Sequence, residues 1–117
     1  MNIFLIGFGG CLGAISRYLL NEVVIKYIPT NFPTGILIVN ILGCLFIGLV
    51  LGNTIVSKDH IYYFFAVGFL GSFTTMSAFS YQAIELFNTN ILIACSYIIL
   101  TLTLTILATY IGINFSK

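Results

Sequence analysis

The chain has 117 residues, of which 60% are hydrophobic and only 6% charged, with a net charge of +1. A soluble domain is about 45–50% apolar and about 25% charged, so this composition excludes an ordinary soluble enzyme. It also excludes a nucleic-acid-binding protein, because four basic residues cannot form a phosphate-neutralising patch. We therefore predict one integral membrane domain, residues 1–117, that passes several times through the cell membrane in contact with lipid.

Charged residues divide the chain into apolar stretches long enough to cross a bilayer. A bilayer core about 30 Å thick needs a helix of about 20 apolar residues. The uncharged stretches are 1–16, 27–57, 60–84 and 86–116. Because Pro29 and Pro33 break the first connection, we predict four transmembrane helices at about 2–26, 34–55, 60–87 and 91–115.

The basic residues predict no single orientation in the membrane. Four helices place both termini on the same side, together with Lys58 and Lys117, and leave Lys26 and Arg17 on the other. The positive-inside rule requires an excess of Lys and Arg on one face. We therefore expect either insertion in both orientations or an orientation imposed by a partner.

Small residues recur at a spacing that brings helices close together. In lipid the hydrophobic effect does not press helices together, so small side chains and polar contacts do. Gly9 and Gly13 are four residues apart, as are Gly48 and Gly52. Three cysteines, whose spacing fits neither zinc nor a redox pair, are interpreted as packing residues; they are Cys11, Cys44 and Cys95. Since four helices enclose little interior, we predict that a pore would lie between two chains.

Polar residues inside the apolar stretches carry the functional signal. Asn40 lies in mid-helix, where an amide costs several kcal/mol unless it finds partners, so it either bonds another helix or lines a pore. Tyr97, Thr101, Thr105 and Thr109 recur every four residues, which places their hydroxyls along one helix face. These hydroxyls either bond carbonyls of their own helix or form a polar track that donates hydrogen bonds to an anion.

Arg17 lies in the first predicted helix, one turn before Glu22. It either snorkels to the membrane interface, pairs with Glu22 or attracts anions to a vestibule. Glu22 and Glu85 fall near the ends of predicted helices, which leaves no carboxylate at mid-membrane. That pattern argues against a proton-coupled mechanism.

The densest polar pattern is the segment 68–80, Gly-Phe-Leu-Gly-Ser-Phe-Thr-Thr-Met-Ser-Ala-Phe-Ser. It falls at the centre of the third predicted helix, where so much Gly, Ser and Thr favours an interruption. Interrupted backbone is tolerated at membrane depth only where protein buries it or a cavity adjoins it. Freed carbonyls there can hold a cation, whereas helix N-termini favour an anion.

This segment resembles the signature of the Fluc-type (CrcB) fluoride channels, which runs approximately Gly-Phe-Cys-Gly-Gly-Phe-Thr-Thr-Phe-Ser-Thr-Phe-Ser. Further matching motifs follow in order along all four predicted helices, and this ordered set is a specific signal. They are Gly9-Gly10-Cys11-Leu12-Gly13-Ala14 with Arg17-Tyr18, Pro33-Thr34-Gly35 leading to Val39-Asn40 and Gly43, and the ladder Tyr97, Thr101 and Thr105.

The resemblance implies an all-α membrane protein with four transmembrane helices, the third broken near its centre, assembled as an antiparallel dual-topology dimer. It implies passive export of fluoride, which relieves fluoride toxicity, through two pores along the subunit interface. A structural sodium ion is the implied cofactor, with no organic cofactor, and its ligands fall on the backbone carbonyls of Gly71 and Thr74.

The resemblance also assigns the residues of the fluoride path. Asn40 matches the pore asparagine, Arg17 the vestibule arginine, and Phe79 the second of two pore phenylalanines, whose electropositive ring edges can face an anion. The implied pore set is Asn40, Phe79, Met76, Ser77, Tyr97, Thr101 and Thr105.

Five positions depart from the family pattern, and several of them remove hydroxyl or aromatic groups from the path. They are Ile36 for threonine, Ser72 for glycine, Met76 for the first phenylalanine, Ala78 for threonine and Gln82 for an acidic residue. One alternative is therefore a heterodimer with a paralogous subunit, in which this chain supplies only part of a pore. Two different functions also stay open: a small multidrug-type transporter, which needs a mid-membrane carboxylate, and a subunit that serves assembly alone.

Overall fold

The computed structural model of this chain describes residues 2–30, 32–52 and 60–116. In chain order the helices are α1 (Asn2–Tyr27), α2 (Thr34–Leu51), η1 (Tyr62–Leu70), α3 (Gly71–Phe73), α4 (Met76–Thr89) and α5 (Ile91–Ser116). The π-helix η1 continues into α3 and α4 as one bent span. The predicted all-α fold with four long apolar helices, the third of them interrupted, is confirmed over these residues.

Of the connections between the long helices, the third is very short, and most of the second lies outside the described residues. The second helix was expected to reach residue 55, but residues 53–59, with most of the second connection, lie outside the described residues. The bent span runs to Thr89, so Asn90 alone separates α4 from α5. Asn90 accepts the N–H of Leu92 at its side-chain Oδ1 (3.0 Å), and this bond starts α5 without a longer loop.

The dimensions and the surface of the fold suit a membrane. The fold measures 45 by 28 by 23 Å, and a bilayer with its headgroups is about 40–45 Å thick. Many large apolar side chains stay at the surface, among them Ile3, Leu92 and Phe115, each more than 70% exposed. Water would penalise such a surface, whereas lipid or another apolar chain would not.

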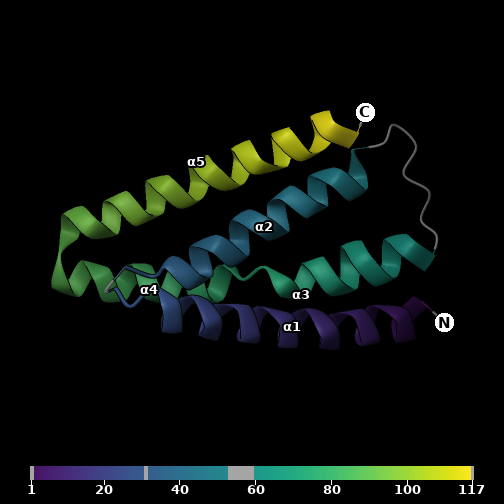
Figure 1. Cartoon of the computed structure of the whole chain (residues 1–117), viewed down its shortest axis with the longest axis horizontal. Helices are drawn as coiled ribbons and strands as arrows, with labels where there is room; N and C mark the ends of the chain where they lie inside the picture. Colours follow the sequence, from purple (N-terminus) through teal and green to yellow (C-terminus); the bar gives the residue numbers. More distant parts are fainter. Residues whose placement is uncertain (1, 31, 53–59, 117) are drawn as a thin grey trace.

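The helices lie in two adjacent pairs, α2 beside α5 and α1 beside the bent span (Figure 1). Glycine allows the first pair to approach closely. A Cβ atom on Gly112 would collide with the carbonyl of Leu45, and one on Gly48 would collide with the carbonyl of Thr109. The contact between α2 and α5 therefore depends on backbone-to-backbone packing, as expected for helices that associate in lipid.

The second pair is held by a glycine contact and a side-chain hydrogen bond. A Cβ atom on Gly13 of α1 would collide with the carbonyl of Phe69. The Ser72 hydroxyl of α3 lies 2.9 Å from the Gly10 carbonyl of α1 and 2.6 Å from the Gly68 carbonyl of its own span. Ser72, one of the departures from the family pattern, thus ties α1 to the span just before the interruption.

Gly112→Ala should lower stability, because the added methyl group has no space and overpacking costs about 1–3 kcal/mol. Gly7→Ala is the matched control, since a Cβ there meets no described residue within 4 Å and both changes gain the same helix propensity, up to about 1 kcal/mol. Thermal unfolding midpoints in detergent would compare the two variants. Equal midpoints would contradict the close α2–α5 packing.

Candidate functional site

The bent span is interrupted at Thr74 and Thr75, whose backbones are extended (φ/ψ −80°/155° and −147°/113°). Thr75 caps the helix that follows, because its Oγ1 accepts the N–H of Ala78 at 3.2 Å. The N-terminus of α4 therefore begins in the middle of the span, and its positive dipole end and free N–H groups face the interruption.

The side chain of Asn40 holds this interruption against α2. Its Oδ1 accepts the N–H of Thr75 at 2.9 Å, and its Nδ2 donates to the carbonyl of Thr75 at 3.3 Å. Both residues are less than 10% exposed, so each of these backbone groups would cost about 1–3 kcal/mol if left unpaired. Asn40 thus makes the bond between helices, and the second N–H of its amide is left to serve another acceptor.

A pocket of about 200 Å³ lies beside the interruption, between α2, the start of α4 and α5. It brings together most of the expected pore residues from three helices that are far apart in sequence. Leu102 and the Phe79 ring give it apolar walls, and threonine and asparagine supply its polar groups. The lining residues are Asn40, Cys44, Thr74, Thr75, Met76, Phe79, Thr101, Leu102 and Thr105.

The hydroxyls that recur along α5 differ in whether they are already bonded. Thr105 Oγ1 lies 2.6 Å from the Thr101 carbonyl, and Thr109 Oγ1 lies 3.1 Å from the Thr105 carbonyl and 3.2 Å from the Cys44 carbonyl. Thr101 Oγ1 is buried and has no hydrogen-bond partner within the described ranges, although the residue is only 5% exposed. Buried polar atoms are nearly always paired, so the unpaired Thr101 hydroxyl could donate a hydrogen bond to a ligand in the pocket.

Two of the expected pore residues lie outside the pocket lining. Tyr97 is fully buried behind Phe79, with the ring centroids 5.2 Å apart, and its hydroxyl donates to Gln82 Oε1 at 3.1 Å. Ser77 is exposed, and its Oγ lies 3.2 Å from the Oγ1 of Thr75. Tyr97 therefore supports the Phe79 ring from behind, where no anion in the pocket would touch it.

Arg17 and Gly71 are not among the residues that line the pocket. Arg17 is half-buried on α1, and in the described part of the chain its Nε has no hydrogen-bond partner and no ion pair joins it to Glu22. Gly71 is exposed at the start of α3. The neighbouring Thr74, by contrast, borders the pocket itself.

Sequence reasoning assigned no role to Thr75 and interpreted Cys44 only as a packing residue. For both residues, the spacing in the sequence could have indicated the role. Cys44 lies four residues after Asn40, on the same face of α2, and Thr75 lies three residues before Ala78, the spacing of a hydroxyl that caps a helix. The interruption, which brings Thr75 to Asn40, is what joins these positions into one site.

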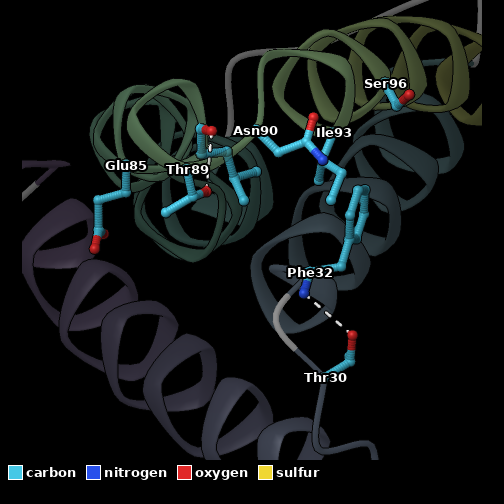
Figure 2. A pocket seen from close by; sticks show the side chains of 8 residues that line it. Thr30, Phe32, Glu85, Thr89, Asn90, Ile93 and Ser96 are labelled. Carbon is cyan, nitrogen blue, oxygen red and sulfur yellow. Dashed lines mark hydrogen bonds between the residues drawn. The ribbon is translucent and has the colours of Figure 1, made fainter.

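A larger cavity of about 730 Å³ lies at one end of the molecule (Figure 2). Its side chains come from the first connection, α4 and α5, and the short hydrogen bond from Phe32 N–H to Thr30 Oγ1 (3.1 Å) lies at its edge. It contains none of the expected site residues, and its one charged side chain, Glu85, is exposed. Because the smaller pocket brings together most of the expected pore residues and the larger cavity brings together none, the smaller pocket is the better candidate site.

Comparisons with known proteins match nearly the whole chain. A family model described as CrcB-like protein, Camphor Resistance (CrcB), matches residues 4–113. The chain is 42% identical to a protein of Flavobacterium psychrophilum named fluoride-specific ion channel FluC, over 98% of this chain and 96% of the relative. A protein of the same name from Clostridium novyi is 41% identical, over 92% and 88% of the two chains. A protein of Clostridium acetobutylicum named fluoride-specific ion channel FluC 2 is 36% identical, over 96% and 95%.

Asn40→Leu should destabilise the fold, because it leaves the N–H and the carbonyl of Thr75 unpaired at a cost of about 1–3 kcal/mol each. Thr101→Val is the control, since its hydroxyl has no partner in the described part of the chain and valine has nearly the same shape. Thermal unfolding in detergent, in buffer without fluoride, would measure both. A Thr101→Val midpoint as low as that of Asn40→Leu would contradict this assignment of the hydrogen bonds.

Proposed function

The chain belongs to the CrcB-like family, and on that premise we propose that it is a fluoride-specific ion channel and not an enzyme. It would export fluoride passively across the cell membrane and so relieve fluoride toxicity. The observation that carries this proposal is the pocket at the interruption, where an unpaired buried hydroxyl, an amide N–H and a helix N-terminus meet.

The chemistry of the pocket suits a small, strongly hydrated anion. Such an ion enters only if donors replace its water. Thr101 offers a free O–H, and Asn40 offers its second amide N–H. The Phe79 ring adds an electropositive edge, and the dipole of α4 favours negative charge at its start. A larger anion has a lower charge density and would form weaker hydrogen bonds with these donors, so the proposed selectivity rests on the donors and not on the pocket volume.

We further propose that two copies of this single membrane domain close the pore, as an antiparallel dual-topology dimer. On one chain the pocket lies open beside Met76, whose side chain is 70% exposed, and lipid offers no hydrogen bonds to a passing anion. A second subunit would supply the missing wall. The partner is either another copy or a paralogous subunit, because Met76 brings no ring to the path where the family has one.

A structural sodium ion on the axis of that dimer has support from the backbone. In a continuous helix the carbonyls of Gly71 and Thr74 would accept the N–H groups of Thr75 and Ala78. Those two N–H groups are bonded instead to Asn40 Oδ1 and Thr75 Oγ1. Both carbonyls thereby lose their helical donors and are left to face a hard cation, and two from each subunit would give four oxygen ligands.

Thr101→Val should reduce fluoride efflux from proteoliposomes by about tenfold or more, since a hydrogen bond to a charged group contributes about 1.5–3 kcal/mol. Thr105→Val removes the same hydroxyl one turn away, but that hydroxyl already serves the Thr101 carbonyl, so efflux should change little. A fluoride electrode would record both rates, with chloride efflux and size-exclusion profiles as controls. Equal losses would show that the free hydroxyl has no special part.

No fluoride efflux from the chain alone or together with any paralogue would contradict the channel itself. Efflux that requires the paralogue would identify this chain as one half of a heterodimer. The comparison therefore separates the two assemblies within one assay.

Replacing sodium by a bulky organic cation should lower the thermal midpoint of the dimer, because a bound ion stabilises the folded state by about 2.7 kcal/mol at a hundred times its Kd. Thr74→Ser should keep this sodium dependence, since the proposed ligand is the backbone carbonyl. Thr74→Pro should abolish it, because proline removes the N–H bonded to Leu70 and forces Phe73 out of helical geometry. A midpoint independent of sodium concentration would refute the site.

A further inference from the structure

Two residues that line the candidate pocket carry sulfur, and their sulfur atoms have no part in the function proposed above. Cys44 reaches the pocket from α2, one turn after Asn40, and Met76 reaches it as the first residue of α4. The other two cysteines, Cys11 and Cys95, are exposed and do not line this pocket. A thiol and a thioether from distant parts of the chain therefore share a space of about 200 Å³.

A second feature of the pocket points to a ligand independently of the sulfurs. Thr101 is 5% exposed and lines the same pocket, and its buried Oγ1 has no hydrogen-bond partner among the residues described. A hydroxyl oxygen also has lone pairs that can approach a cation. The pocket thus combines two soft ligands with one unsatisfied oxygen.

We propose that Cys44 and Met76 form a binding site for a soft monovalent metal ion, Cu(I) or Ag(I). Thiolate and thioether sulfur are the ligands such ions prefer over oxygen. The Cys44 Sγ–H bond breaks as the Sγ–metal bond forms, and the proton leaves to water, with no change of oxidation state. Met76 Sδ supplies the second ligand, and the flexible methionine side chain can reach the ion.

The surroundings favour a monovalent ion over a divalent one. Among the described residues no carboxylate lines the pocket, and Phe79 and Leu102 contribute apolar walls. A thiolate and a monovalent cation form a neutral complex, which such a low-polarity space can hold without a further counter-charge. Bound there, and provided that the proposed fluoride path is correct, the ion would obstruct that path beside Thr101.

Silver binding to the purified chain tests the site without relying on fluoride flux. Cys11→Ser/Cys95→Ser in detergent, titrated with silver nitrate in chloride-free buffer, should bind one silver ion per chain and release one proton. Adding Cys44→Ser should abolish this binding, and adding Met76→Leu instead should weaken it while leaving the thiol in place. Unchanged affinity in both added variants would overturn the proposal.

Fluoride efflux provides the second measurement. Silver should inhibit efflux through the Cys11→Ser/Cys95→Ser chain, and the ratio of rates with and without silver should return to one when Cys44→Ser is added. Silver binding with no fluoride efflux, from the chain alone or together with any paralogue, would support the metal site and contradict the proposed channel. Fluoride efflux that silver leaves unchanged, with no silver bound, would overturn the metal site and leave the channel standing.

Discussion

A broken helix inside a membrane depends on what pairs its backbone groups. Water is absent at that depth, so every unpaired N–H or carbonyl costs several kcal/mol. In this chain the Asn40 side chain pairs both backbone groups of Thr75, and the Thr75 hydroxyl pairs the N–H of Ala78. With these three bonds the interruption is a stable element that holds α2 and α4 in a fixed relation, and the pocket is built upon it.

The same bonds create the polarity of the site. The N–H groups of Thr75 and Ala78 donate to side-chain oxygens and not to the carbonyls one turn earlier. The carbonyls of Gly71 and Thr74 therefore lack their helical donors. The start of α4 keeps its positive dipole end beside the pocket. Two carbonyls without helical donors and the positive end of a helix thus arise within residues 71–76, from one local change of backbone. One asparagine in apolar sequence therefore organises both the interruption and the pocket beside it.

Periodicity predicted the fold well because it follows from the bilayer. Four spans and the interruption could be read from charge spacing and from the concentration of Gly, Ser and Thr between residues 68 and 80. The sequence spacing could not show which side-chain hydroxyls are already hydrogen-bonded within the chain. Thr101 and Thr105 stand on one face at the same spacing, yet only Thr105 bonds back to its own helix. Tyr97 shares that face and is nevertheless buried behind Phe79, because the packing of α4 on α5 decides which hydroxyls reach the pocket.

The departures from the family pattern differ in whether the side chain contacts other residues of the same chain. Ser72 bonds the Gly10 carbonyl, Gln82 accepts the Tyr97 hydroxyl, and Ile36 is buried in the core with Phe79. Each of these three is accommodated within the chain. Met76 has no such accommodation, since it stands 70% exposed at the mouth of the pocket. Met76 is thus the departure at which a second subunit, a passing anion or a soft metal ion would contact this chain. The identity of the partner subunit therefore matters more at Met76 than at the other departures.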